Sequence, residues 1–258
     1  MRIVADANIP VLADLFSPVC EFQQIDGRRI ESAMLRDADA LIVRSITPVN
    51  EALLAESSVR VVATATSGVD HIDVDWLSSQ GIKLVSAAGE NAQAVADYVT
   101  AALAHLVEPF QIGKSGMKCG VIGVGHVGTE VARRLLALGC EVLLCDPPRD
   151  DVGDTSALGR FVSMEEMSGC DLITLHTPLI QDGIHPTYQF IETGFLHSLP
   201  AQAILINTSR GEVIDEAALI SAVRARKDLQ VVLDVFDDEP QVSLKFRALA
   251  ISCYMWRG

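Results

Sequence analysis

Three glycines near the middle of the sequence have the spacing G-x-G-x-x-G, which is typical of a loop that binds the phosphates of a dinucleotide. They are Gly123, Gly125 and Gly128. In such a loop the first glycine permits a tight turn, the second lets the backbone approach a pyrophosphate, and the third allows close packing of helix against strand. His126 and Val127 lie within this loop, and the helix predicted after it, 130–138, offers unpaired N–H groups and a positive dipole end at its N-terminus. We therefore expect these five residues to bind a cofactor pyrophosphate.

An acidic residue follows the next predicted strand, where a dinucleotide-binding fold needs one. Asp146 comes directly after the apolar run 141–145 and can accept hydrogen bonds from the hydroxyls of an adenosine ribose. Its charge would also repel a 2′-phosphate, so the sequence favours NAD over NADP. Arg149 lies close enough in the sequence to weaken that preference.

Three later strands are also followed by polar residues, and in a parallel sheet such positions meet at the edge where ligands bind. Thr177 follows one predicted strand, Thr208 and Ser209 follow the next, and Asp234 lies within the third. We expect these residues to lie beside the glycine-rich loop.

The same edge carries the candidates for substrate chemistry. Arg210 follows a predicted buried strand, and its planar guanidinium suits bidentate binding of a carboxylate. Glu239, in an acidic turn before Pro240, could orient and charge a histidine. Among the histidines, only His176 is brought to this edge by the strand order, which makes it a candidate acid or base. The six histidines show no metal-ligand spacing, and we expect no metal site.

Two loops rich in hydroxyl groups follow strands in the first third of the chain. One begins with Arg44 and Ser45, and the other includes Thr64, Thr66 and His71. Hydroxyls and glycine N–H groups at strand ends can hold phosphate or carboxylate oxygens. The pattern does not decide between such a site and a simple turn.

Composition restricts the class of protein. The chain has 258 residues, 49% of them hydrophobic, and a formal net charge of −14. This charge disfavours a nucleic acid or an anionic membrane as partner, because both reward a basic surface. An anionic substrate would therefore need a local cluster of arginine or lysine. The six cysteines form no CxxC pair, which indicates buried thiols in a reducing cytoplasm rather than disulfides or zinc. We expect neither a targeting segment nor a membrane span.

Short β-branched runs alternate with helical patterns along the whole chain, which predicts an α/β fold with two doubly wound parallel sheets. A long alanine-rich helix predicted over 91–107 separates them, so we expect domains at 1–90 and 91–258. The predicted strands are 2–5, 40–44, 59–65, 83–86, 118–124, 141–145, 171–176, 203–207 and 230–235. The other predicted helices are 11–16, 30–36, 74–80, 130–138 and 216–224.

The motifs together resemble the D-isomer-specific 2-hydroxyacid dehydrogenases, over residues 1 to about 242. The resemblance rests on the glycine-rich loop with Asp146, on His-Thr-Pro-Leu at 176–179, on Ile-Asn-Thr-Ser-Arg-Gly at 206–211 and on the segment 234–240. Residues 44–50, 64–71 and 145–149 are similar to the branch of this family that oxidises 4-phospho-D-erythronate in pyridoxal phosphate biosynthesis. The implied fold is a flavodoxin-like substrate-binding domain followed by a Rossmann NAD-binding domain.

The resemblance also implies roles for individual residues. Arg210 would bind the substrate carboxylate and line the NAD site, Glu239 would pair with the catalytic base, and Ser45 and Thr66 would contact the substrate. The other implied NAD-binding residues are Gly123 to Gly128, Asp146, Thr177, Thr208, Ser209 and Asp234.

The sequence departs from the family pattern near its end. The family places its catalytic histidine in a Pro-His-x-Ala-Gly loop shortly after the glutamate, whereas no histidine follows His197 here. We therefore expect a truncated or frameshifted product that lacks the segment returning to the first domain and has little or no turnover.

The motifs leave other functions open. The chain could be another D-2-hydroxyacid dehydrogenase, of the 3-phosphoglycerate or hydroxypyruvate type, or a non-catalytic NAD-binding protein. The leading hypothesis implies a phosphorylated hydroxy acid as the small-molecule partner, a homodimer for the full-length parent and a cytoplasmic location.

Overall fold

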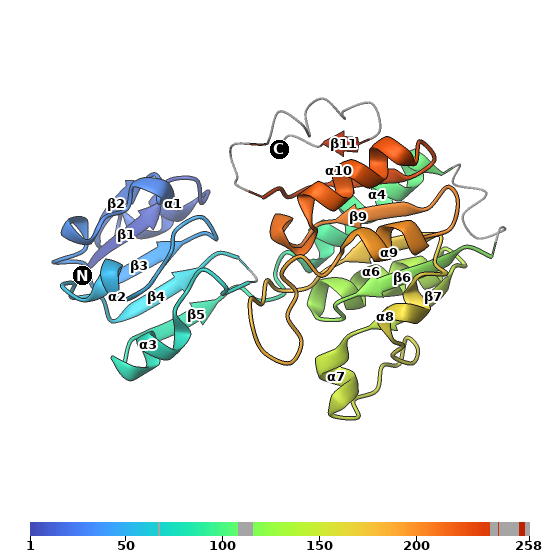
Figure 1. Ribbon diagram of the computed structural model, residues 1–258. Helices are drawn as coiled ribbons and strands as arrows, with labels where there is room; N and C mark the ends of the chain where they lie inside the picture. Colours follow the sequence, from blue (N-terminus) through green and yellow to red (C-terminus); the bar gives the residue numbers. More distant parts are fainter. Residues whose placement is uncertain (67, 108–115, 238–241, 243–252, 256–258) are drawn as a thin grey trace. The chain divides into compact units, whose positions relative to one another are not determined.

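The structure is a computed structural model (Figure 1), and it describes residues 1–66, 68–107, 116–237, 242 and 253–255. The chain divides into two compact units, Met1–Asn91 and Ala92–Gly258. The first unit has one parallel sheet and the second has another. The predicted class, an α/β protein with two doubly wound parallel sheets, is confirmed.

The sheet of the first unit has five strands in the order β2-β1-β3-β4-β5, all of them parallel. This order is that of the flavodoxin-like folds, whose ligands bind at the carboxyl ends of the strands. The strands are β1 (Arg2–Asp6), β2 (Glu21–Ile25), β3 (Ala40–Val43), β4 (Val61–Thr64) and β5 (Lys83–Ser86).

Short helices connect these strands: α1 (Leu12–Phe16), α2 (Glu51–Leu54) and α3 (Val74–Ser79). Their side chains and those of the sheet bury a core that includes Leu35, Leu41 and Leu77. Asn50 and Asp73 cap the last two helices by accepting backbone N–H groups, which satisfies donors that a helix N-terminus leaves unpaired.

The sequence misjudged three segments of this unit, one of them the short helix α2, which it did not predict. The helix expected over 30–36 is wrong, because two 3-10 helices, Gly27–Arg29 and Ser32–Met34, occupy this region. The buried Ile30 between them is extended, with φ −72° and ψ 119°. Strand β2 was not predicted because Glu21, Gln23 and Gln24 interrupt the apolar pattern. Polar side chains are tolerated there because β2 is an edge strand exposed to solvent.

The second unit contains a six-stranded parallel sheet in the order β11-β10-β9-β8-β6-β7. Beyond β7, a parallel bridge between Leu144 and Phe161 stands where a Rossmann sheet has a further strand. The strands are β6 (Lys118–Ile122), β7 (Glu141–Cys145), β8 (Leu172–Leu175), β9 (Ile204–Asn207), β10 (Gln230–Leu233) and β11 (Cys253–Met255). The sequence did not predict β11.

Helices cover both faces of this sheet. The core of one face includes Val99 of α4 and Val131 of α6, and the core of the other includes Leu196 of α9 and Leu219 of α10. The strands β8 and β9 are buried at every residue and are apolar apart from Thr174 and Asn207, as is common in parallel sheets covered on both faces. The helices are α4 (Ala92–Leu106), α6 (His126–Ala137), α7 (Pro147–Asp151), α8 (Met164–Met167), α9 (Thr193–Ser198) and α10 (Glu216–Ala225), with a 3-10 helix at Gly211–Val213.

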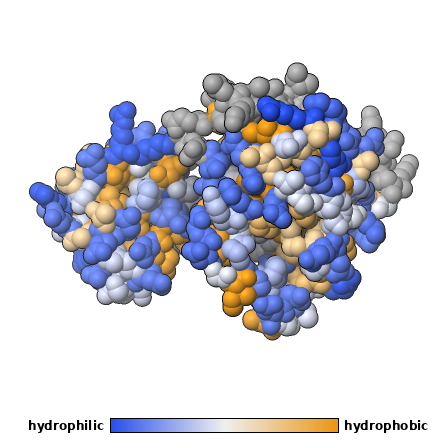
Figure 2. Space-filling model, in the orientation of Figure 1, coloured by the Kyte–Doolittle hydropathy of each residue, from blue (hydrophilic) through white to orange (hydrophobic). Residues whose placement is uncertain are grey.

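The surface is predominantly polar on the face shown in Figure 2, in keeping with the charge of −14. Some large apolar side chains are nevertheless exposed, Ile184 and Val152 most of all. Within the described residues, no helix combines the length and apolar character needed to cross a membrane.

Candidate functional site

The glycine-rich loop connects β6 to α6 in the conformation that the sequence predicted. Gly123 has φ +85°, and a Cβ there would come within 2.7 Å of the carbonyl group of His176. At Gly128 a Cβ would lie 1.9 Å from the carbonyl oxygen of Gly123. Gly125 differs, because a Cβ there would meet nothing within 4 Å. The first and third glycines are therefore required by the protein itself, while the second faces open space.

That open space lies at the N-terminus of α6, which begins at His126 with Gly125 as its N-cap. The N-cap makes no side-chain hydrogen bond, so the first N–H groups of the helix are available to an anion. The open space at Gly125 leaves room for a ligand, and a pyrophosphate there stays a prediction from the glycine spacing.

Asp146 and Arg149 hold this loop from the neighbouring strand. The carboxylate of Asp146 accepts the backbone N–H of Val124 at 2.7 Å, and the Nη1 of Arg149 donates to the carbonyl oxygen of Val124 at 2.6 Å. The Nε of Arg149 pairs with Asp154 at 2.7 Å, and its guanidinium lies 5.1 Å from the centre of the Phe161 ring.

These contacts bear on which nucleotide the site would accept. Asp146 remains at the end of β7, where a carboxylate can meet a ribose diol. Arg149 is engaged with Asp154, Val124 and Phe161, so binding a 2′-phosphate would require it to break existing contacts. The geometry thus favours NAD more clearly than the sequence did.

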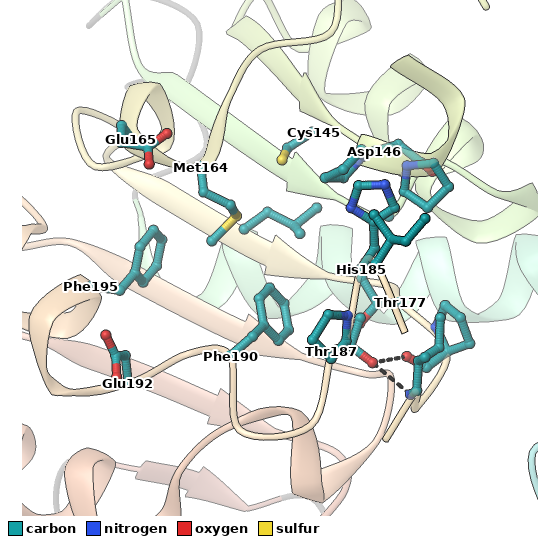
Figure 3. A pocket seen from close by; sticks show the side chains of 18 of the residues that line it. Cys145, Asp146, Met164, Glu165, Thr177, His185, Thr187, Phe190, Glu192 and Phe195 are labelled. Atoms are coloured by element: carbon teal, nitrogen blue, oxygen red, sulfur yellow. Dashed lines mark hydrogen bonds between the residues drawn. The ribbon is translucent and has the colours of Figure 1, made fainter. Parts of the chain in front are cut away.

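A cavity of about 640 Å³ opens beside the loop, within the second unit. Its volume lies in the range of ordinary ligand pockets. Figure 3 shows Asp146 and Thr177 at one side of it and the apolar Met164, Phe190 and Phe195 at the other. The hydroxyl oxygen of Thr177 is buried and has no hydrogen-bond partner among the described residues. A buried hydroxyl without a partner is costly, and a bound ligand would supply one.

The segment 178–187, which lines part of this cavity, was not identified as part of a site from the sequence. Thr187 donates to the carbonyl oxygen of Pro178 at 2.6 Å and accepts the N–H of Ile180 at 2.8 Å (Figure 3). The Nε2 of His185 lies 2.7 Å from a carboxylate oxygen of Asp151, at the end of α7. The sequence offers only a weak signal for these contacts, because they join segments that no local pattern relates.

The end of β9 presents Thr208, Ser209 and Arg210, and a buried asparagine shapes this turn. Asn207 accepts the N–H and the hydroxyl of Ser209 at 3.0 and 2.8 Å, and it donates to the carbonyl oxygen of Arg210 at 2.8 Å. Asp234 follows β10, and its N–H donates to the carbonyl oxygen of Asn207 at 3.0 Å. The predicted residues of these two strand ends therefore lie at one edge of the sheet. Glu239 lies outside the described residues.

His176 does not suit the role of acid or base suggested from the sequence. Its ring nitrogens lie 2.9 Å from the hydroxyl of Thr174 and 3.1 Å from that of Thr208. Burial lowers the pKa of His176 to about 3, so the ring stays neutral near pH 7. Its ring is engaged with the hydroxyls of Thr174 and Thr208 instead.

The hydroxyl groups predicted in the first unit lie together by strand register. Val43 pairs with Thr64 in the parallel ladder of β3 and β4, so Ser45 and Thr66 follow at equivalent positions. The hydroxyl of Thr66 lies 2.8 Å from that of Thr64 and donates to the carbonyl oxygen of Gly68 at 3.3 Å. Arg44, at the same edge, pairs with Asp6 at 2.8 Å.

The described residues contain no group of three or more His, Cys, Asp or Glu side chains that could hold a metal ion.

Comparison with known proteins agrees with these features. The family model for the NAD binding domain of D-isomer specific 2-hydroxyacid dehydrogenases matches residues 85–250. The erythronate-4-phosphate dehydrogenase of Edwardsiella ictaluri is 46% identical over 96% of this chain, and that of Proteus mirabilis is 47% identical over 95%. The chain spans 66% and 65% of the lengths of these two relatives.

Solved structures show the same fold. A D-lactate dehydrogenase from Aquifex aeolicus in complex with NAD and lactic acid has a TM-score of 0.82 and 23% identity, covering 99% of this chain and 87% of that one. An NAD-bound 3-phosphoglycerate dehydrogenase from Entamoeba histolytica has a TM-score of 0.76 and 23% identity, with coverages of 99% and 86%.

Proposed function

The chain belongs to the D-isomer specific 2-hydroxyacid dehydrogenase family, and on that premise we propose that it binds NAD and takes part in oxidising 4-phospho-D-erythronate to the corresponding 2-oxo acid. The substrate follows from the similarity to erythronate-4-phosphate dehydrogenases, at 44–47% identity. The loop geometry supports the cofactor: a Cβ at Gly125 would meet open space, at a helix N-terminus next to Asp146.

Each unit has its own part in this proposal. Residues 1–90 form the substrate-binding domain, and residues 91–258 form the NAD-binding domain. In the second, Gly123 to Gly128 bind the pyrophosphate, Asp146 binds the adenosine ribose, and Thr177 gives its unpartnered hydroxyl to the cofactor. Thr208, Ser209 and Asp234 complete the lining of the site. NAD, when bound, accepts the hydride that leaves C2 of the hydroxy acid.

The chain's own residues hold the substrate and direct its charge. Arg210 binds the substrate carboxylate, and its guanidinium favours the carbonyl character that develops at C2 as the C–H bond breaks. Ser45 and Thr66 donate hydrogen bonds to substrate oxygens in the first unit. The resemblance to the family assigns Glu239 to pairing with a histidine that takes the hydroxyl proton.

The rate of oxidation depends on which group accepts the hydroxyl proton. His176 is neutral and held between two threonine hydroxyls, and no histidine follows His197 in the 258 residues. A positioned acid or base contributes about 10²–10⁴-fold to a reaction of this type. We therefore expect these 258 residues to bind NAD normally and to turn over slowly, with the proton leaving to a solvent base.

The test separates binding from turnover. Calorimetric titration of the purified chain should show one NAD site, which Asp146→Ala weakens about tenfold or more. NADH formation from 4-phospho-D-erythronate should be slow and should increase with added imidazole, which supplies the missing base. A chain that does not bind NAD, or that prefers 3-phospho-D-glycerate to 4-phospho-D-erythronate, contradicts the proposal.

We also propose that the protein acts as a homodimer in the cytoplasm. Support for the compartment comes from the cysteines, since Cys119, Cys140, Cys145 and Cys170 are buried free thiols. Sedimentation and cell fractionation test the two statements separately.

A further inference from the structure

A row of polar residues crosses the carboxyl edge of the second sheet. The last residues of β8, β9 and β10 are in register in the parallel ladder. The residues that follow them, His176, Thr208 and Asp234, therefore stand beside one another on the same side of the sheet. The backbone N–H of His176 donates to the carbonyl oxygen of Ile122 at 2.8 Å, so the row begins next to the glycine-rich loop.

The ring of His176 lies between two threonine hydroxyls. Its Nε2 is 2.9 Å from the hydroxyl oxygen of Thr174, and its Nδ1 is 3.1 Å from that of Thr208. Burial lowers the pKa of His176 to about 3, so the ring is neutral near pH 7, with one nitrogen that donates and one that accepts. The hydrogen can be on either nitrogen, and its position decides whether Thr208 accepts from the ring or donates to it.

Thr174 selects between these two arrangements. Its side chain is fully buried in β8, and within the described part of the chain its hydroxyl has no hydrogen-bond partner besides Nε2 of His176. If Nε2 carried the ring hydrogen, the O–H of Thr174 would have no acceptor, and a buried donor without an acceptor is costly. Thr174 therefore donates to Nε2, and the ring hydrogen is on Nδ1.

This tautomer determines what Thr208 offers to a ligand. The half-buried Thr208 accepts the hydrogen bond of Nδ1–H, so its own O–H hydrogen is available for donation. The neighbouring Asp234 is exposed, and its carboxylate can only accept. Because adjacent strands lie about 5 Å apart, the edge presents a donor beside an acceptor. A primary amide is complementary to this pair, because its carbonyl oxygen accepts and its NH2 group donates.

The position of the pair in the sheet indicates which part of a dinucleotide would meet it. A dinucleotide spans the crevice where the strand order reverses, which lies here between β6 and β8. Asp146, proposed for the adenosine ribose, follows β7 on one side of that point, whereas Thr208 and Asp234 follow strands on the other side. The nicotinamide half, which carries a primary amide, would therefore lie over β9 and β10.

We propose that His176 is a positioning residue, which donates from Nδ1 to Thr208 and thereby directs the Thr208 hydroxyl to donate to the carboxamide oxygen of nicotinamide. The inference rests on the proposed function for the identity of its ligand. Asp234 accepts from the NH2 group of the same carboxamide. A carboxamide held in this way fixes the plane of the nicotinamide ring, which favours hydride transfer because the reacting atoms must be aligned.

Nitrogen NMR of the chain with isotope-labelled histidine measures the position of the ring hydrogen without a cofactor. The signals of His176 are those absent from a His176 variant. At neutral pH they should show a hydrogen on Nδ1 and none on Nε2. The opposite tautomer would overturn the inference, because Thr208 would then donate to the ring rather than to a ligand.

Three ligands locate the contribution of Thr208 along the cofactor. They are NAD, acetylpyridine adenine dinucleotide, which keeps the carbonyl oxygen but lacks the NH2 group, and ADP-ribose, which lacks the ring. Thr208→Val should raise the dissociation constants of the first two about three- to tenfold, the loss of one neutral hydrogen bond, and leave that of ADP-ribose within about twofold. The matched control is Thr100→Val, because the hydroxyl of Thr100 donates within α4, to the carbonyl oxygen of Ala96 at 2.7 Å. Its affinity for NAD should stay within about twofold of the parent.

Two amide replacements of different length test His176. His176→Gln places its amide near the position of Nε2 and loses the donor to Thr208, so it should weaken NAD binding about three- to tenfold and leave ADP-ribose binding unchanged. His176→Asn keeps a donor near the position of Nδ1 and should stay within about twofold of the parent. In the Thr208→Val background His176→Gln should have no further effect, because His176 acts through Thr208. Melting curves identify any variant that does not fold, and the NMR measurement on the parent chain remains decisive in that case.

Parent-like NAD affinity in Thr208→Val would overturn the inference. A loss in His176→Gln that is as large for ADP-ribose as for NAD, or a folded His176→Asn chain as weak as His176→Gln, would also overturn it, because either result shows a role that does not depend on a donor to Thr208. Failure of the proposed function has a different signature. A chain that binds neither NAD nor ADP-ribose contradicts the proposed function, whereas a chain that binds NAD equally well without the Thr208 hydroxyl keeps that function and loses this inference.

Discussion

Alanine substitutions at two glycines of the loop should have different consequences. Gly125→Ala should weaken NAD binding, whereas Gly128→Ala should destabilise the fold. Gly125→Ala places a methyl group in open space, with no atom within 4 Å. Its backbone, with φ −75° and ψ −153°, is accessible to alanine, so we expect the free energy of unfolding to change by less than about 1 kcal/mol. The same methyl group would stand where a pyrophosphate approaches the backbone. Losing one or two charge-assisted hydrogen bonds should raise the NAD dissociation constant about ten- to hundredfold.

Gly128→Ala should act on the fold instead. Its methyl carbon would lie 1.9 Å from the carbonyl oxygen of Gly123, so helix and loop must separate by about 1.5 Å to reach an ordinary contact. Overpacking of this kind costs about 1–3 kcal/mol. We therefore expect a lower unfolding free energy, with weaker NAD binding as a consequence of the displaced loop.

Urea unfolding and calorimetric NAD titration of the two variants measure both effects. Gly169→Ala is the control for a general effect of replacing glycine, because its Cβ would approach nothing closer than 4.0 Å and it lies outside the loop. Parent-like NAD affinity in Gly125→Ala, or parent-like stability in Gly128→Ala, would refute the assignment of the two glycines.

Three further predictions follow from the polar contacts of the second unit. Thr177→Val should weaken NAD binding about three- to tenfold without loss of stability, because its hydroxyl has no hydrogen-bond partner in the described part of the chain. Thr187→Val should instead lower stability, because that hydroxyl makes two hydrogen bonds. The reverse pattern in melting and titration experiments would contradict the cavity assignment. The pKa of His176 falls from 6.5 to about 3 on folding, so the unfolded chain binds a proton that the folded chain does not, and the unfolding free energy should drop by up to about 1.4 kcal/mol per pH unit as the pH decreases below 6.5. Urea titrations at several pH values should show that His176→Gln removes this part of the slope, and an unchanged slope would count against a buried neutral ring. Arg226→Met should cost about 2–4 kcal/mol in urea unfolding, because Arg226 donates to three backbone carbonyl groups and to Asp228; a loss below about 0.5 kcal/mol would show that water replaces these bonds.

Several features of the fold could be predicted from the sequence because local rules govern them. The continuous apolar runs of β8 and β9 predict strands buried on both faces, and the structure has them. Strand β2 was not predicted because most of its side chains are polar at a sheet edge. The α-helix expected over 30–36 is wrong because the buried Ile30 and Leu35 reach the core from an extended residue and a short 3-10 helix.

Some features of the candidate site could also be predicted from the sequence, and others could not. The glycine spacing and the aspartate after β7 predict a dinucleotide loop, since a positive φ and a close helix–strand contact each demand glycine at one position. The cavity beside the loop was not predictable, because His185 meets Asp151 only after β7, β8 and their connections have folded.

The sequence by itself therefore determined the family, the alternation of strands and helices and the conformation of the glycine loop, because these depend on residues near one another in the chain. Only the tertiary structure decided that His176 stays neutral, that the Thr177 hydroxyl has no hydrogen-bond partner among the residues described, and that Arg44 pairs with Asp6, which lies 38 residues away in the chain. These properties depend on burial and on hydrogen bonds between segments that are distant in the chain, and no local sequence pattern specifies them.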